Sequence, residues 1–225
     1  MTATATDLPR LIALMTGDDK HQAAAESTVD VLWVLYDRVL DITPENFHDP
    51  GRDRFLLSKG HGPMAYYAIL AAKGFLDEDE LAGWAGARSR LGHHPDRKRA
   101  PGVEISSGSL GHGLPLALGT ALGLRARGHT SKVVTLVGDA ELDEGSNSEA
   151  IVVAARLGLG NLTTVVVDNQ SSTHGWPGGI ARRFEVEGWA TRTVSGRDHE
   201  ALYEAFTTAH PDRPLAVVAV VEPKG

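Results

Sequence analysis

The sequence predicts an α/β fold with a mostly parallel sheet and helices on both of its faces. Residues 133–137 (VVTLV) and 162–167 (LTTVVV) are short, continuous, β-branched runs, which is typical of strands buried on both faces. Residues 147–157 lie between them and carry apolar side chains at helical spacing. Because strand–helix–strand alternation implies a crossover connection, the two strands are expected to run parallel.

The remaining elements extend this pattern along the chain. Two more buried strands are expected at residues 190–194 and 215–221, separated by a helix at residues 199–209. Upstream, apolar periodicity and Gly or Pro breakers predict helices over 29–40, 62–73, from 77 to 84, and over 114–126. We expect one domain spanning residues 1–225, with an N-terminal helical extension over about residues 1–50.

Composition excludes several classes of function. The chain has 225 residues, no Cys and a formal net charge of −7, so it has no disulfide, thiolate zinc site, cysteine-held iron–sulfur cluster or Cys nucleophile. No concentrated basic face is visible, which argues against nucleic acid as a partner. No apolar run approaches the roughly 18 residues of a membrane span, and no targeting segment is recognised. A cytoplasmic protein is expected.

Polar residues follow two consecutive predicted strands. Residues 138–145 (GDAELDEG) follow the first strand, and Asp168-Asn169 follows the second. Asp and Asn are common in turns and helix caps, but these two positions are one βαβ unit apart, and ligands bind at this edge of parallel sheets. The Asp139 carboxylate and the Asn169 amide oxygen are therefore expected side by side. With a loop carbonyl after Asn169 they suit Mg²⁺, whose free positions phosphate oxygens would fill, so we expect a metal-bridged diphosphate site.

Four ordered blocks carry a family resemblance. They are residues 52–62 (RDRFLLSKGHG), 102–113 (GVEISSGSLGHG), 138–150 and 167–175. With these blocks the chain resembles the diphosphate-binding half of a transketolase, in the two-subunit form where that half is a separate polypeptide. The resemblance runs from about His21 to Gly225 and implies the thiamine diphosphate-binding fold.

The resemblance implies two cofactors, thiamine diphosphate and Mg²⁺, or Ca²⁺ or Mn²⁺ in its place. The metal would be held by Asp139, Asn169 and a backbone carbonyl near Ser171. Gly138 and Ala140 would let the backbone approach the diphosphate, although Ala140 stands where the family usually has Gly. A methyl group there is tolerable only if φ is negative.

Further site residues follow from the same blocks. His61 would contact the cofactor phosphate or the substrate, and His94 would lie near the thiazolium, with His93 as the competing candidate. The resemblance also implies that Gly108, Ser109 and Leu110 line the thiamine rings. Glu144 would contact the cofactor as well, and Glu144 and Glu149 would lie at the cofactor-bearing interface between subunits. His112 is read as a helix cap and Trp176 as a loop anchor.

Two departures from the family pattern fall on the substrate side. The family's His-x-Gly-Gly-Ser turn, whose His touches substrate, is here His21-Gln22-Ala23-Ala24-Ala25-Glu26-Ser27. The family's "KG–G" turn and its later Trp-His-Gly are missing after Gly225. These changes favour an unusual donor or acceptor, for example a carrier-bound thiol.

The implied activity is transfer of a two-carbon ketol unit from a ketose, or ketose phosphate, to an aldehyde or carrier-bound acceptor. His side chains suit the proton transfers because their pKa lies near the working pH. Family members take an activating glutamate from a second, pyrimidine-binding domain, so a partner subunit in an α2β2 assembly is expected. The alternatives are the α-type subunit of a thiamine-dependent 2-oxoacid dehydrogenase or decarboxylase, a degenerate non-catalytic cofactor-binding partner, and a generic nucleotide-binding α/β protein.

Overall fold

The fold is built on a parallel sheet. The computed structural model describes residues 3–17 and 24–223. Within them the sheet has five strands in the order β1-β2-β3-β5-β4, and every neighbouring pair is parallel. The strands are β1 (Arg54–Leu57), β2 (Val133–Gly138), β3 (Leu162–Asp168), β4 (Ala190–Ser195) and β5 (Leu215–Val220). The predicted α/β class with a parallel sheet is therefore confirmed.

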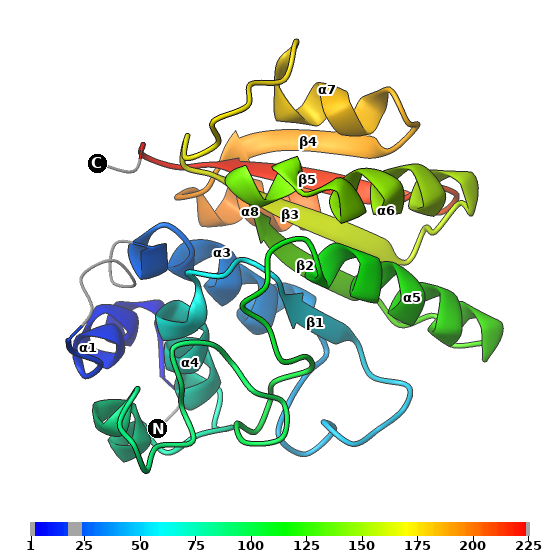
Figure 1. Cartoon of the computed structure of the whole chain (residues 1–225). Helices are drawn as coiled ribbons and strands as arrows, with labels where there is room; N and C mark the ends of the chain where they lie inside the picture. The colour runs from blue at the N-terminus through cyan, green and yellow to red at the C-terminus, as the bar shows by residue number, and fades with distance from the viewer. Residues whose placement is uncertain (1–2, 18–23, 224–225) are drawn as a thin grey trace.

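Helices cover both faces of the sheet (Figure 1). One face packs against α5 (Gly113–Ala126), α6 (Gly145–Arg156) and α7 (Gly179–Glu185). The other packs against α1 (Leu8–Ala13), α3 (Val29–Val34), α4 (Pro63–Ala72) and α8 (His199–Phe206). Short turns complete the described elements: η1 (Ala5–Asp7), η2 (Leu35–Val39), η3 (Glu78–Gly83) and η4 (Ala140–Asp143).

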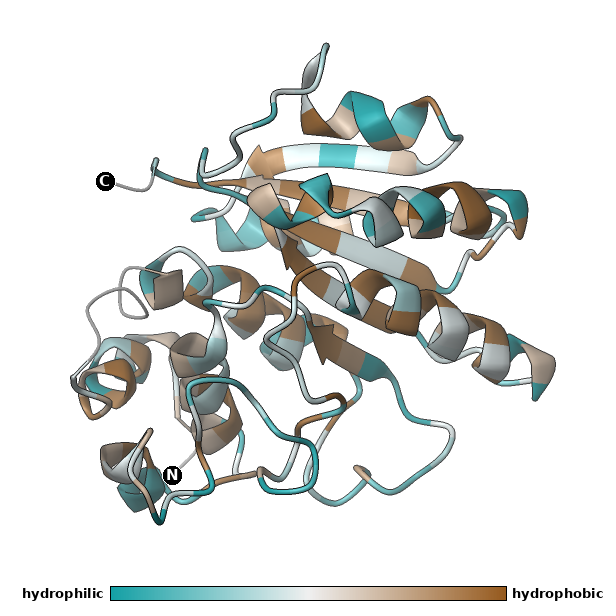
Figure 2. Ribbon diagram, in the orientation of Figure 1, coloured by the Kyte–Doolittle hydropathy of each residue, from teal (hydrophilic) through white to brown (hydrophobic). Residues whose placement is uncertain are grey.

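Strand alternation explains the two cores. In β2, Val133 and Val137 pack toward α5 and α6, while Val134 and Leu136 pack toward the opposite core. Successive side chains of a strand point to opposite faces, so a continuous apolar run fills both cores at once. Figure 2 shows this as hydrophobic colouring along the central strands.

Most predicted elements are present, with informative differences. The strands expected at 133–137, 162–167 and 215–221 are confirmed as buried, whereas β4 was wrongly expected to be buried. It is the edge strand of the sheet, and its Arg192 and Thr193 side chains are exposed. An edge strand has one unpaired side, which tolerates such polar residues.

Several helical boundaries also differ. The expected helix over 29–40 is α3 followed by a π-helical turn, η2, and the segment from 77 to 84 is a 3₁₀ helix with an Asp77/Glu80 capping box. The helix expected over 199–209 ends at Phe206. Strand β1 and helix α7 were not predicted, because each is short and carries Arg within it.

The N-terminal helices belong to the same core as the sheet. Leu8 and Leu11 of α1 are buried in the cluster that contains α4 and the α8 side of the sheet. Arg10 adds an exposed ion pair to Glu78 at 2.9 Å. No helix within the described ranges has the length and apolar character needed to cross a membrane.

Candidate functional site

A cleft opens at the carboxyl ends of β2 and β3, where the turn that follows Gly138 meets the loop that begins at Asn169. It has about 450 Å³ of space not filled by atoms. Its lining combines several segments of the chain: Ala24, Lys59, Gly60, His61, Leu110, Gly138, Ala140, Glu141, Asn169 and Ser171. Parallel sheets bind ligands at this edge, so the fold places the predicted diphosphate segments where a ligand can reach them.

Asp139 organises the turn between β2 and η4. Its side chain is buried and accepts hydrogen bonds from the Ser171 backbone N–H at 2.6 Å and the Ser171 hydroxyl at 2.6 Å. A third comes from the Ser172 N–H at 2.9 Å. The parallel pairing of β2 with β3 brings Asp139 and Ser171 together across 32 positions of sequence. The predicted neighbourhood of Asp139 and Ser171 is therefore present.

Asn169 lines the cleft with a buried Oδ1 atom that has no hydrogen-bond partner. Three other buried side-chain oxygens of the described residues share this state, on Asn147, Asn161 and Thr164, but none of those residues lines the cleft. A buried acceptor without a partner costs free energy, unless another species satisfies it. Asp139 and Asn169 directly follow the paired strands β2 and β3, and a carboxylate and an amide oxygen are ligands that suit a hard divalent cation, so the residue types present fit the predicted metal.

The loop after Asn169 is strained at one residue. Gln170 has φ +56°, a left-handed conformation that is uncommon for residues other than Gly, Asn and Asp. This turn directs the Ser171 and Ser172 N–H groups to Asp139. Ala140, by contrast, is not among the described residues with positive φ, so its methyl group adds no backbone strain where the family pattern has Gly.

The turn after β1 forms a second wall of the cleft. Lys59 is buried beside Gly138 and donates to the Thr28 hydroxyl at 3.0 Å and the Ser27 hydroxyl at 3.2 Å. His61 follows two residues later, exposed at the cleft. Lys59 thereby joins the N-terminal end of α3 to this wall.

His94 and His93 have different surroundings. A Cβ atom added to Gly108 would lie 2.8 Å from His94 Cγ, so the His94 ring lies against the Gly108 backbone. His93 instead packs edge-on against Trp84, with ring centroids 5.1 Å apart. This arrangement favours His94 over His93 as the functional histidine, and Leu110 from the Gly108 loop lies close to Gly60 in the cleft wall.

Glu141 is a buried carboxyl group that sequence reasoning did not single out. It accepts hydrogen bonds from the Ser58 hydroxyl, from the Gly111 N–H at 2.9 Å and from the Gly138 N–H at 3.3 Å. Burial raises the pKa of the Glu141 carboxyl above its usual range. Its position in a run of acidic residues gave no signal of burial.

The other predicted residues take varied positions. Ser109, Glu144 and Glu149 are exposed, and Glu144 packs beside Gly111. His112 occupies the N-cap position of α5, as predicted, but its side chain makes no cap hydrogen bond. His21 lies outside the described residues.

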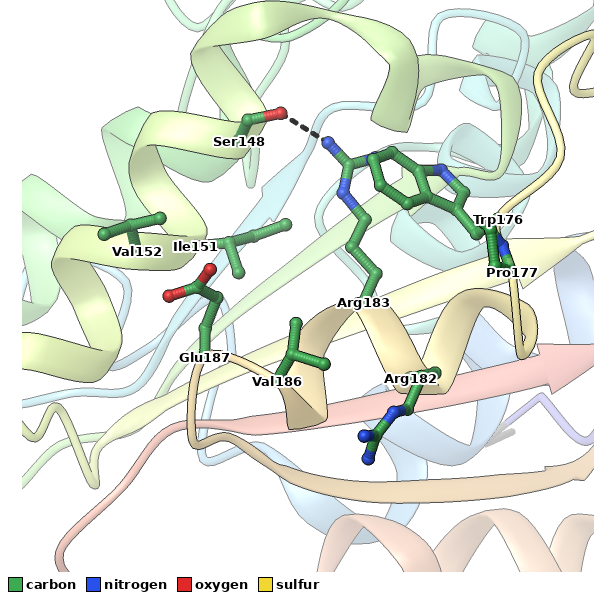
Figure 3. A pocket seen from close by; sticks show the side chains of 9 residues that line it. All are labelled: Ser148, Ile151, Val152, Trp176, Pro177, Arg182, Arg183, Val186 and Glu187. Carbon is green, nitrogen blue, oxygen red and sulfur yellow. Dashed lines mark hydrogen bonds between the residues drawn. The ribbon is translucent and has the colours of Figure 1, made fainter.

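Trp176 ties the loop after β3 to the body of the domain. The Arg183 guanidinium stacks on its ring, 3.9 Å from the centroid, and donates to the Ser148 hydroxyl (Figure 3). The same guanidinium also donates to the Leu142 carbonyl. These contacts match the predicted role of Trp176 as a loop anchor. A pocket of about 640 Å³ of unfilled space lies beside them, between α6 and α7.

Comparison with known proteins agrees with this geometry. Residues 10–221 match the family model described as "Transketolase, thiamine diphosphate binding domain". The chain is 36% identical over 206 residues to a subunit of the apulose-4-phosphate transketolase of Actinobacillus succinogenes, covering 88% of this chain and 75% of that protein. It is 56% identical over 216 residues to a protein named ferredoxin fas2 of Rhodococcoides fascians, covering 96% of this chain and 71% of that protein.

A solved structure shows the same fold. A transketolase variant from Pichia stipitis superposes with a TM-score of 0.81 at 25% identity, covering 96% of this chain but 35% of that one. The chain thus spans about a third of the length of that solved transketolase. Family model, relatives and fold agree: the chain belongs to the transketolase family, as its thiamine diphosphate-binding part.

Proposed function

We propose that the chain is the cofactor-binding subunit of a thiamine diphosphate- and Mg²⁺-dependent transketolase-like enzyme. The observation that supports this is that the buried Asp139 and the unsatisfied Asn169 oxygen follow the neighbouring strands β2 and β3, where Asn169 lines a cleft together with His61 and Leu110. The reaction is transfer of a two-carbon ketol unit from a ketose, or ketose phosphate, to an aldehyde or a carrier-bound acceptor.

Each part of the cleft has a distinct task in this proposal. Asp139, Asn169 and the backbone carbonyl near Ser171 hold the metal, and Gly138 and Ala140 leave room for the diphosphate. When bound, thiamine diphosphate supplies a nucleophilic carbon and an electron sink. Leu110, Gly108 and Ser109 line its rings. His61 and His94 exchange protons with substrate hydroxyl groups, as imidazole does efficiently near neutral pH, and His21 is proposed to contact the substrate.

We also propose that activity requires a partner polypeptide with the pyrimidine-binding domain, in an α2β2 assembly. The support is an exposed apolar face on α5, α6 and α7. Of nine exposed large apolar side chains in the described ranges, seven lie on these helices or next to them in the sequence: Leu116, Leu122, Val152, Val153, Leu157, Trp176 and Val186. Exposed apolar side chains that gather on one side of a domain mark protein interfaces. Glu144 and Glu149 lie exposed next to this face.

The names of two relatives bear on the substrate. The Actinobacillus succinogenes protein is named for apulose 4-phosphate, and one from a Clostridium species for 6-deoxy-6-sulfo-D-fructose, at 32% identity. Both names specify an anionic ketose, which supports a ketose phosphate or a similar donor here. A carrier-bound acceptor and a cytoplasmic location complete the proposal. The name ferredoxin does not transfer, since this chain has no Cys to ligate an iron–sulfur cluster.

The alternatives differ in what they would do. An α-type subunit of a 2-oxoacid dehydrogenase or decarboxylase would use pyruvate in place of a ketose phosphate. A degenerate partner would bind the cofactor without needing Asp139 for turnover. The match to the transketolase family model and to a subunit of a transketolase favours the ketose donor.

The test begins with the complex isolated from its own cells. Native mass spectrometry with Mg²⁺ and thiamine diphosphate should show a second polypeptide in the complex, with one cofactor per pair of chains. The purified complex should then turn over ketose phosphate, and Asp139→Ala should abolish turnover. A complex that prefers pyruvate would establish the 2-oxoacid alternative, and full activity of the Asp139→Ala complex would establish the degenerate one.

A further inference from the structure

The loops that form the cofactor cleft meet at one buried carboxylate. Glu141 is 2% exposed, and its three hydrogen-bond donors come from two loops and from the end of the strand before it. Ser58 belongs to the turn after β1, Gly111 to the loop before α5, and Gly138 to the end of β2. In the sequence, Ser58 and Glu141 are 83 positions apart.

The contacts continue outward from each donor. The Ser58 hydroxyl, which donates to Glu141, accepts a hydrogen bond from the Gly113 N–H at 2.9 Å, at the first residue of α5. Gly113 fits so tightly that a Cβ atom there would lie 2.2 Å from Ser58 Cβ. Gly111 is held from its other side by the Ser146 hydroxyl, which donates to the Gly111 carbonyl at 2.7 Å.

The residues fixed in this way are neighbours of the predicted cofactor contacts. Leu110 precedes Gly111 and packs close to Gly60 in the cleft wall, and His61 follows Gly60. The third donor, Gly138, directly precedes Asp139 in the sequence. A shift of any donor therefore moves a cofactor-contacting residue next to it, since neighbouring backbone atoms move together.

We propose that Glu141 is the positioning residue that holds the turn after β1, the loop before α5 and the end of β2 in the arrangement that binds thiamine diphosphate. The inference rests on the proposed function and goes beyond it, because Glu141 acts through Ser58, Gly111 and Gly138 rather than on the reacting atoms. The two carboxyl oxygens of Glu141 provide enough acceptor sites for all three donors.

The structure supplies a matched control at the opposite end of the sheet. Asp53 is also buried, and it accepts backbone N–H groups from Lys132 at 2.7 Å and from Asp41 at 3.0 Å. It lines no part of the cleft. Asp53→Asn should therefore destabilise the chain without changing cofactor binding.

Two variants of Glu141 give a graded test. Glu141→Ala removes all three acceptor contacts. Glu141→Gln keeps one oxygen for Ser58 and Gly111 but brings an NH₂ group to the Gly138 N–H, so its effect should be intermediate. If the Glu141→Ala variant fails to fold, the Glu141→Gln variant is compared with Asp53→Asn instead.

The first measurement is amide hydrogen exchange of the full chain without cofactor. Glu141→Ala should raise exchange about tenfold or more in residues 58–62 and 108–113, whereas Asp53→Asn should act near residues 41 and 132 instead. Unchanged exchange in the cleft loops of both Glu141 variants would overturn the proposal.

The second measurement is calorimetric titration of thiamine diphosphate with Mg²⁺. We expect Glu141→Ala to raise the dissociation constant about tenfold or more while Asp53→Asn leaves it unchanged. Equal effects of the two variants would show a merely structural role and overturn the inference. Absence of cofactor binding by the wild-type complex would overturn the proposed function alone, since hydrogen exchange still decides whether Glu141 holds the loops.

Discussion

Asn169 illustrates, at the scale of a residue, how a fold can retain an unfavourable group. Its buried Oδ1 has no hydrogen-bond partner in the structure, while the nearby Asp139 has three donors. Asp139 and Asn169 follow the neighbouring strands β2 and β3. In the metal-free chain the hydrogen bonds of Asp139 stabilise the fold, whereas the unpaired oxygen of Asn169 destabilises it.

We predict that Asn169→Leu abolishes Mg²⁺-dependent cofactor binding with little loss of stability. The free energy of unfolding without metal should change by less than about 1 kcal/mol, because an apolar group of similar shape removes an unsatisfied acceptor. Asp139→Leu should lose both binding and about 1–3 kcal/mol, since it leaves buried donors unpaired. Urea unfolding and calorimetry measure the two quantities. A large stability loss in Asn169→Leu would contradict this account.

The second prediction at the residue scale concerns Gly108. Its φ of +129° and its contact with His94 leave no room for a side chain. Gly108→Ala should cost about 1–3 kcal/mol of stability and lower turnover by displacing the His94 ring. The control is Gly119→Ala in α5, where a Cβ atom meets nothing within 4 Å. This substitution should stabilise the chain by about 0.5–1 kcal/mol.

The residue scale also shows what could be inferred from sequence alone. The neighbourhood of Asp139 and Asn169 followed from two strand ends one crossover apart. Glu141 could not be found in the same way, because the acidic run DAELDE does not indicate which of its carboxyl groups is buried. Its burial depends on Ser58 and Gly111, which reach it only through tertiary packing. A local pattern carries no information about such partners.

At the scale of elements, strands could be predicted where the local sequence pattern matches the burial that the strand has in the fold. Strands β2, β3 and β5 are continuous apolar runs because both of their faces are covered. Strand β1 is only four residues long and begins at Arg54, so its pattern is too short to recognise. The polar sequence of β4 reflects its place at the sheet edge, which no local pattern specifies.

The loop between β3 and α7 gives a prediction at this scale. Gln170 holds a left-handed conformation, with φ +56°, and Gly adopts this conformation without steric cost. Gln170→Gly should therefore stabilise the chain by up to about 1 kcal/mol, offset in part by the greater entropy of the unfolded state. Gln170→Val should instead destabilise it. Thermal unfolding distinguishes the two, and equal melting temperatures would contradict the strain.

For the whole molecule, the distribution of apolar side chains predicts which side meets another polypeptide. Val153 lies exposed on α6, which covers the same side of the sheet as α5 with its exposed Leu116. Val153→Glu should leave the melting temperature of the isolated chain within a few degrees, because the residue is exposed, and should prevent assembly with the partner.

Ala209→Glu is the control for this prediction. It adds the same charge at an exposed position just beyond α8, on the opposite side of the sheet. Analytical ultracentrifugation of the purified polypeptides should show a complex with Ala209→Glu and none with Val153→Glu. Assembly of both variants with the partner would show that the partner binds another surface.

The organisation of residues 1–225 as a single domain stays a prediction at the scale of the whole molecule.

The apolar face also has a consequence for how cells must produce the protein. A chain made in excess of its partner would keep Leu122, Val152 and Val186 in water, and such surface favours self-association and recognition by chaperones and proteases. Synthesis of the two polypeptides is therefore expected to be balanced, with the surplus chain degraded. In such a system the scarcer polypeptide sets the cellular abundance of both.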